Sequence, residues 1–183
     1  FDLIERVGSA QWPCNAKDAP EGTEVLHTKT FPRGRANFML TAYVPTQERV
    51  TDRFPLLLTT GRILSQYNVG TQTGRTGNLA WYSEDLLDVH ASDAKQRGIV
   101  DGDWVSITSR YGSTRLRARI SERVSPGTVY TTFHFAKSKA NAITSDLSDW
   151  ATNCPEYKVT AVDVVKSPAR QAAETPAVAD AQA

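Results

Sequence analysis

Cysteine, histidine and methionine are scarce in this 183-residue sequence, which has two cysteines, three histidines and one methionine. Two cysteines are too few for a disulfide scaffold, and neither Cys14 nor Cys154 has a second Cys or a His nearby at the spacing of a zinc site. We therefore expect both cysteines to be reduced. His27, His90 and His134 form no HxxxH or HExxH pattern, so a metal site built by this chain alone is not expected.

An excess of charge of one sign and apolar runs of membrane length are also missing. The net charge of +1, from 21 basic and 20 acidic residues, excludes a field strong enough to attract nucleic acid or an anionic membrane. No stretch approaches the roughly 18 apolar residues of a membrane span, and the first residues lack the regions of a signal peptide. We therefore predict a cytoplasmic protein without a nucleic-acid or membrane partner. Since the chain does not begin with methionine, we also expect a segment of something longer.

The length and the 40% hydrophobic content predict one core domain with extensions. Residues 1–37 are punctuated by Pro and Gly and are predicted to form an extended arm from a preceding domain. Residues 38–166 are predicted to form the domain itself. Residues 167–183 are rich in Ala, Pro and small polar residues and have too little apolar bulk to pack, so a flexible C-terminal tail is expected.

Alternating and continuous apolar patterns predict the regular structure of the domain. Strands are expected at 36–44, 53–60, 104–109, 114–120, 125–135 and 158–165. A short helix is expected at 91–98, with Ser92 as N-cap and Gly98 as terminator. Arg115, Arg117 and Arg119 alternate with apolar residues and are expected on one solvated face of a hairpin. This pattern favours a small mixed β-barrel, mainly β with short helices.

A polar, glycine-rich stretch follows the apolar strand at 53–60. In "LLLTTGRILSQYNVGTQTGRTGN" (56–78), glycines permit close backbone approach, and Thr, Arg, Gln and Asn supply hydrogen-bonding groups. Such a loop suits a phosphate-bearing ligand, because arginine and exposed amides both bind phosphate. It matches neither a Walker motif nor GxGxxG, so an ordinary surface loop is the alternative.

A second polar cluster lies between the last two expected strands, where no apolar periodicity explains it. Its members are Asn141, Thr144, Asp149, Asn153, Tyr157 and Lys158. We expect the segments 60–68 and 141–158 to face one cleft, with Asn141 and Lys158 turned towards Gly61 and Arg62.

Several separated blocks resemble one known family. They are "GSAQWPCN", "EGTEVLHTKTFPRGRANF", "LLLTTGRILSQYNVGTQTGRT", "HASDAKQRGIVDGDWVSITSRYG", "SPGTVYTTFHF", "ANAIT" and "SDWATNCPEYKVTAV". Over roughly residues 8–166 they are similar to the C-terminal molybdopterin-dinucleotide-binding domain of molybdenum oxidoreductases, and most of all to the alpha subunit of soluble, NAD-dependent formate dehydrogenases. The resemblance implies a six-stranded double-psi β-barrel of the aspartate-decarboxylase-like class.

The resemblance also implies which residues bind the cofactor. They are Thr60, Gly61, Arg62, Ile63, Leu64, Gln66, Tyr67, Asn68, Phe133, Asn141, Tyr157 and Lys158. Arg62 and Lys158 suit phosphates, Gln66 and Asn68 suit amide-like edges, and Phe133 suits a ring. Phe133 as plain barrel core and Arg62 as a solvated charge remain the alternatives.

The resemblance further implies what this chain lacks. Many relatives have a basic residue where this chain has Gly74, which leaves Arg75 as the substitute. The molybdenum ligand and the substrate-binding His and Arg lie in earlier domains of the family, so we expect no catalytic residue and no metal ligand here. The implied cofactor is molybdenum bis(molybdopterin guanine dinucleotide), with iron–sulfur clusters, FMN and NAD elsewhere in the complex. The implied partners are the remaining domains of the alpha subunit, iron–sulfur and flavin subunits, and formate as substrate.

Two other functions stay open at this point. Within the family, the chain could belong to another molybdenum reductase, such as a nitrate reductase. Outside it, a free-standing double-psi barrel could act as an interaction module, as in some ATPase chaperones. The two polar segments discriminate, because an interaction module does not need them.

Overall fold

The computed structural model describes residues 1–14, 22–31 and 33–168, and these form two compact units, Phe1–Val44 and Pro45–Ala183. The expected C-terminal tail, 167–183, lies outside the described residues apart from its first two. Within the described ranges, no helix has both the length and the apolar character needed to cross a membrane.

Among the described residues of the first unit there is one short helix, α1 (Asp2–Val7). It ends at Gly8, whose φ of 80° is in the left-handed region that favours glycine. None of its residues is buried. The sequence pattern predicted an irregular arm, and α1 was missed because it has no apolar stripe to reveal it.

The strand predicted at 36–44 is wrong. The described backbone there forms no ladder, and the side chains of Phe38, Leu40 and Tyr43 are exposed. Apolar composition alone led to this prediction, whereas a strand also needs a hydrogen-bonding neighbour. The barrel of the second unit offers no free edge, since each of its strands already has two neighbours.

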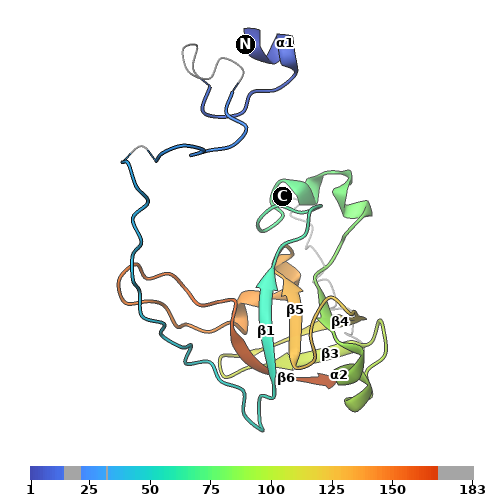
Figure 1. The fold of residues 1–183 in the computed structure, drawn as a ribbon. Helices are drawn as coiled ribbons and strands as arrows, with labels where there is room; N and C mark the ends of the chain where they lie inside the picture. Colours follow the sequence, from blue (N-terminus) through green and yellow to red (C-terminus); the bar gives the residue numbers. More distant parts are fainter. Residues whose placement is uncertain (15–21, 32, 169–183) are drawn as a thin grey trace, which may run out of the picture. The chain divides into compact units, whose positions relative to one another are not determined.

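The second unit is a closed six-stranded barrel (Figure 1). Its strands are β1 (Leu56–Gly61), β2 (Leu86–Val89), β3 (Trp104–Thr108), β4 (Ser113–Ile120), β5 (Thr128–Thr132) and β6 (Thr160–Lys166). They follow one another around the barrel in the order β1, β5, β2, β4, β3, β6, with β1–β5 and β2–β4 parallel and the other pairs antiparallel. This is the double-psi barrel that the resemblance implied.

Alternation builds the core. Along β1 and β3 every second residue is buried, and Leu58, Val105 and Ile107 meet Val129 of β5 and Val164 of β6 in one apolar cluster. The strands predicted near β1, β3, β4, β5 and β6 are confirmed, with ends shifted by a few residues. All members of this cluster come from the barrel and its connections.

Strand β2 was not predicted. It has only four residues, and its buried Asp88 interrupts the apolar pattern. The helix that follows, α2 (Ala91–Gln96), was predicted, but its N-cap is His90 and not Ser92. The His90 ring nitrogen Nδ1 accepts a hydrogen bond from the backbone N–H of Ser92 at 3.2 Å. Gly98, with φ of 63°, follows the helix as predicted.

The hairpin of β3 and β4 is confirmed, but its arginine face is not simply solvated. Arg119 donates two hydrogen bonds to the buried carboxylate of Asp88, at 2.6 and 2.9 Å, because β2 and β4 pair these two residues in register. Arg117 pairs with Glu84, and Arg115 is half-buried. The alternation of arginines with apolar residues does not reveal that Asp88 of β2 will lie beside Arg119.

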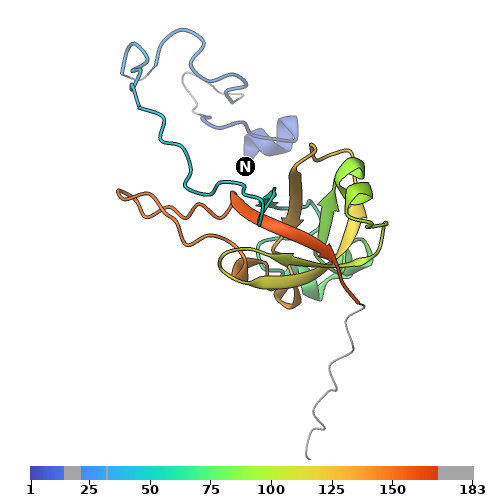
Figure 2. The same cartoon turned by 90° about the horizontal axis from the view of Figure 1, so that it is seen from below.

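Four short 3-10 helices lie in the connections: η1 (Thr73–Arg75), η2 (Gly77–Ala80), η3 (Ala136–Ser138) and η4 (Ala140–Ala142). Between η4 and β6 the chain forms a long hairpin closed by a bridge between Ser148 and Pro155. Figures 1 and 2 both show this segment, in orange, projecting from the barrel.

Candidate functional site

The strand register brings the expected site segments to one end of the barrel. β1 and β5 are parallel, with Gly61 opposite Thr132, so the segments that follow them leave from the same edge. β6 runs antiparallel to β1, and its first residue Thr160 lies opposite Leu58. We call the residues that gather there, 62–82, 133–144 and 157–159, the loop end of the barrel.

Two hydrogen bonds join the segment before β6 to the end of β1. The Thr60 hydroxyl donates to the carbonyl of Tyr157 at 3.1 Å, and the Lys158 amine donates to the carbonyl of Thr60 at 3.4 Å. In each of these two hydrogen bonds the donor and the acceptor lie almost a hundred residues apart in the sequence. Lys158 was expected to face Gly61 and Arg62, and the hydrogen bond that it makes is to Thr60, directly before them.

Arg62 and Phe133 lie together at the ends of the two parallel strands. The Arg62 guanidinium is 5.8 Å from the centroid of the half-buried Phe133 ring, within the range of a cation–π contact. The Tyr130 hydroxyl donates to the carbonyl of Arg62 at 3.0 Å, and burial raises the pKa of Tyr130, which keeps it a donor. The Arg62 side chain is exposed, and it joins none of the ion pairs in the described part of the chain.

The expected binding residues from 63 to 68 point in different directions. Leu64 and Tyr67 are exposed, whereas Gln66 is buried. The Gln66 amide donates to the carbonyl of Tyr82 at 3.0 Å and accepts from the Thr73 hydroxyl at 2.6 Å, so both of its polar ends are used inside the loop. Gln66 holds the loop together in this structure and presents nothing at its surface.

Backbone donors remain in the same segment. Leu64, Ser65 and Asn68 donate no backbone hydrogen bond to any residue that the structure describes. Together with Arg62 and Lys158 they form a set of N–H donors suited to an anionic group with many oxygens.

Asn141 makes no hydrogen bond with this set of donors in the described structure. It is exposed on η4, and its carbonyl accepts a hydrogen bond from the Thr144 hydroxyl at 3.1 Å. No hydrogen bond among the described residues joins its side chain to Gly61 or Arg62. The predicted orientation of Asn141 towards these residues thus finds no support in the contacts.

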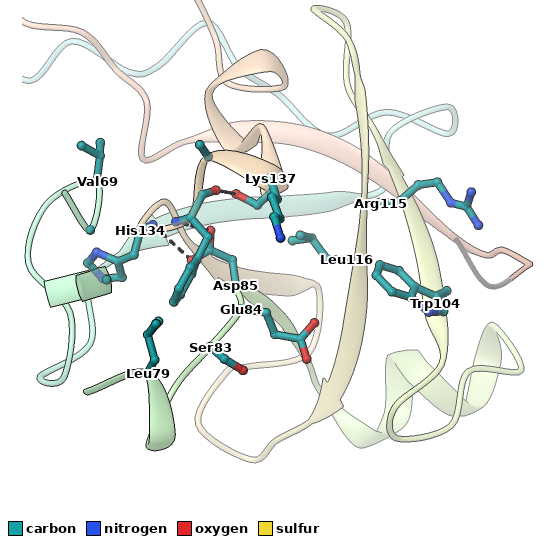
Figure 3. Close-up of a pocket in the computed structure, with 15 residues that line it drawn as sticks. Val69, Leu79, Ser83, Glu84, Asp85, Trp104, Arg115, Leu116, His134 and Lys137 are labelled. Carbon is teal, nitrogen blue, oxygen red and sulfur yellow. Dashed lines mark hydrogen bonds between the residues drawn. The ribbon is translucent and has the colours of Figure 1, made fainter. Parts of the chain in front are cut away.

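A cavity of about 480 Å³ lies between other loop-end residues and the strands β3 and β4 (Figure 3), and no member of this donor set lines it. Its lining includes Val69, Leu79 and His134 on one side and Trp104 and Arg115 on the other. The Arg115 atoms Nε and Nη2 are buried and have no hydrogen-bond partner among the described residues. Guanidinium N–H groups that are buried without a partner are complemented by anionic oxygens.

Sequence reasoning missed two buried residues, His134 at the loop end and Asp85 beside it. The Asp85 carboxylate accepts hydrogen bonds from the Thr132 hydroxyl and from the backbone N–H groups of His134 and Phe135. No spacing pattern in the chain marks these residues, because their partners are backbone groups distant in sequence. A histidine directly after an apolar strand was the only signal.

The strand order and the donor-rich loops define a double-psi barrel with a candidate ligand site at one end. Residues 56–161 match the family described as "Molydopterin dinucleotide binding domain". That match covers more than half of the chain, and the chain belongs to this family.

Curated relatives agree with this membership. The chain is 36% identical over 168 residues to "F420-dependent formate dehydrogenase 2 subunit alpha" of Methanococcus maripaludis, covering 89% of this chain and 25% of the relative. It is 31% identical over 179 residues to "Formate dehydrogenase H" of Escherichia coli, covering 95% and 25%. It is 33% identical over 171 residues to "Assimilatory nitrate reductase catalytic subunit" of Bacillus subtilis, covering 90% and 24%. The chain thus spans about a quarter of the length of these relatives.

Among solved structures, the chain is similar to acetylene hydratase from Pelobacter acetylenicus, with a TM-score of 0.52 and 15% identity over 62% of this chain and 18% of that one. At this identity the likeness concerns the fold alone.

Proposed function

We propose that this chain is the C-terminal part of the large subunit of a cytoplasmic molybdenum formate dehydrogenase, where it binds molybdopterin guanine dinucleotide. The observation that carries the proposal is the contact of Arg62 with Phe133, with Lys158 bound to the nearby Thr60, at the loop end of a chain from the dinucleotide-binding family. Cations suit a pyrophosphate and an aromatic face suits a heterocycle, so one ligand with both parts fits this set.

The residues present fit that cofactor. Arg62 and Lys158 would hold phosphate oxygens, Phe133 and Tyr157 would flank a ring, and the N–H groups of Leu64 and Asn68 would meet further oxygens. Arg115 would find at the cavity the anionic partner that it lacks among the described residues. When bound, the cofactor supplies the molybdenum chemistry, and the chain's share is to hold and orient it. Thr60, Gly61, Ile63, Leu64, Tyr67 and Asn141 complete the proposed contact set, with Gln66 holding the loop from inside.

In this proposal the other domains of the subunit supply the metal ligand and the substrate-binding residues, and formate is oxidised to carbon dioxide. Electrons leave through iron–sulfur clusters and FMN on partner subunits to NAD. The formate dehydrogenase relative from Methanococcus maripaludis is named F420-dependent, so F420 is the alternative acceptor. The relative from Bacillus subtilis named nitrate reductase makes nitrate reduction the second candidate reaction.

Arg62→Ala in the longer protein tests the binding role. Losing a charge-assisted contact to phosphate costs about 1.5–3 kcal/mol, so retained molybdenum and pterin should fall roughly 10- to 100-fold after dialysis, together with activity. Arg53→Ala is the matched control, because Arg53 is exposed and precedes the other end of β1. Normal metal content with a reduced rate would contradict a retention role for Arg62.

Activity assays separate the candidate reactions. The purified complex should reduce NAD with formate, and reduction of F420 alone or of nitrate alone would replace the acceptor or the substrate. The 183-residue chain by itself should not oxidise formate with dye acceptors even when supplied with cofactor. Turnover by this chain alone would refute the division of labour between domains.

A further inference from the structure

His134 lies immediately beyond the end of β5 and is 1% exposed. Both nitrogens of its ring contact the backbone of the glycine-rich loop. Nε2 accepts a hydrogen bond from the backbone N–H of Ile63 at 3.1 Å, and Nδ1 is in a short hydrogen bond with the carbonyl of Asn68. The ring therefore spans the two ends of the segment 63–68.

These two partners determine the state of the ring. A backbone N–H can only donate, so Nε2 must be unprotonated. A carbonyl can only accept, so Nδ1 must carry the proton. Only the neutral imidazole with its hydrogen on Nδ1 satisfies both contacts, because a protonated ring would place N–H against N–H at Ile63.

The backbone of His134 is itself fixed. Its N–H donates to Asp85 Oδ1 at 3.1 Å, and the N–H of Phe135 donates to Asp85 Oδ2 at 3.1 Å. Gly70, at the end of the same loop, passes so close that a Cβ there would lie 2.8 Å from the His134 carbonyl oxygen. Figure 3 shows His134 beside Asp85 at the edge of the cavity, near Val69 of the loop. The ring cannot shift without moving β5 or the loop.

We propose that His134 is a positioning residue, whose imidazole sets the distance between Ile63 and Asn68 and so fixes the shape of the segment that presents Leu64 and Tyr67 to the dinucleotide. The connection to the dinucleotide rests on the proposed function. We call the two hydrogen bonds of the His134 ring to Ile63 and Asn68 the clamp. The clamp itself is a property of this chain. A buried imidazole needs hydrogen-bond partners in any role, and here both partners belong to one loop segment, at its two ends.

Three substitutions separate the clamp from simple packing. His134→Phe fills the space of the ring and loses both contacts. In His134→Gln, Oε1 can take the place of Nε2 and accept from Ile63. In His134→Asn, Nδ2 can take the place of Nδ1 and donate to Asn68. A packing role predicts that the two amides, being smaller than the ring, disturb the site more than Phe.

The first measurement is amide exchange in the 183-residue chain. Exchange at Ile63 should be roughly 2- to 10-fold faster in His134→Phe and His134→Asn than in the wild type, and near the wild-type rate in His134→Gln. His90→Gln is the control, because His90 contacts Ser92 and Glu122 at α2 and has no contact with the loop. Equal effects of all three substitutions, or slower exchange in Phe than in Gln, would overturn the proposal.

The second measurement needs no variant and holds even if His134→Phe fails to fold. The nitrogen NMR shifts of the His134 ring in the wild-type chain should show a proton on Nδ1 and none on Nε2. A proton on Nε2 would overturn the proposal.

Cofactor retention in the longer protein distinguishes this proposal from the proposed function. Retained pterin should fall in the order wild type, then the two amide variants, then His134→Phe. If the exchange and NMR results hold while retention is unchanged, the clamp stands and its connection to the dinucleotide is refuted. If Arg62→Ala also leaves pterin retention unchanged, the proposed function in dinucleotide binding is refuted as well.

Discussion

In the wall of the barrel, apolar side chains such as Leu58, Val105 and Ile107 are buried against one another. At the loop end, buried polar side chains such as Gln66 and His134 have hydrogen-bond partners of their own, beside the apolar Ala140 and Ile143. The wall is stabilised by apolar area removed from water, which does not depend on direction. The loop end is stabilised by hydrogen bonds of Asp85 and His134, and the strength of a hydrogen bond does depend on direction.

This difference has a functional meaning. Apolar packing tolerates substitution by residues of similar volume, while a polar network fails when one partner is lost. A binding site needs backbone donors held in one geometry, and specific hydrogen bonds provide that where few apolar side chains are present. We expect changes in the wall to affect the whole domain and changes at the loop end to act locally.

The largest effect should come from Leu58→Ala. Leu58 of β1 is 1% exposed, and truncating a buried leucine lowers the free energy of unfolding by about 2–5 kcal/mol. Urea unfolding should show one lowered midpoint for the whole barrel. Leu64→Ala is the matched control at the loop end, since Leu64 is fully exposed and should change stability little. Similar losses in both variants would remove the distinction between wall and loop end.

Asp85→Asn should have the next largest effect. The variant keeps the shape of the side chain. It replaces one carboxylate oxygen by an amide N–H₂, which then faces the hydroxyl and N–H groups that now donate hydrogen bonds to Asp85. We expect a loss of about 1.5–3 kcal/mol, expressed mainly as faster amide exchange in residues 62–68. Asp52→Asn, at an exposed position, is the control. Faster exchange spread evenly over β3 and β6 would show that Asp85 supports the wall instead.

The same contrast explains what could be predicted from the sequence. A continuous apolar run located β1, and alternation with turn residues located β3 and β4, because a half-buried strand imposes a period of two on its residues. They failed for β2, whose Asp88 is buried only because Arg119 lies opposite, and for 36–44, where no neighbouring strand exists in the described chain. Contacts that depend on one neighbour cannot be read from local composition.

The residues of the candidate site also differ in how well they could be predicted from the sequence. Lys158 was expected to face Gly61 and Arg62, and its hydrogen bond goes to the preceding residue, Thr60. Gln66 was expected at the ligand, but its partners Thr73 and Tyr82 hold it inside the loop. His134 was noted only as lacking a metal pattern, because its partners are backbone groups about 70 residues away, which no single-sequence pattern encodes.

Gly70→Ala should have a smaller and more local effect. Gly70 has φ of 70°, and an added Cβ would meet the His134 carbonyl at 2.8 Å. The left-handed backbone alone costs an alanine about 1–2 kcal/mol, and the contact pushes against the clamp. Gly74→Ala is the control, because nothing lies within 4 Å of a Cβ there. Exchange at Ile63 should rise in Gly70→Ala only, and a rise in both variants would point to general softening of the loop.

The smallest effect should be seen at the hairpin between η4 and β6, which has a polar centre like the loop end but lies in solvent. Asp149 accepts from the hydroxyl and N–H of Thr152 and from the N–H groups of Cys154 and Ala151, and these bonds, the Thr152 hydroxyl first, lower the pKa of Asp149 to about 2.

Because the folded hairpin favours the ionised carboxylate, its contribution is complete above the ordinary Asp pKa of about 4 and is lost as the pH falls through about 2. The N–H shifts of Thr152 and Cys154 should therefore titrate near pH 2, well below an ordinary aspartate, while those of β3 stay constant over the same step. In Asp149→Asn these N–H shifts should not titrate, and the barrel should unfold at the wild-type urea concentration at pH 7, because the turn is exposed. A titration midpoint near 4 would mean that the four donors do not hold the carboxylate in solution. A lowered barrel midpoint in the variant would mean that this hairpin belongs energetically to the wall.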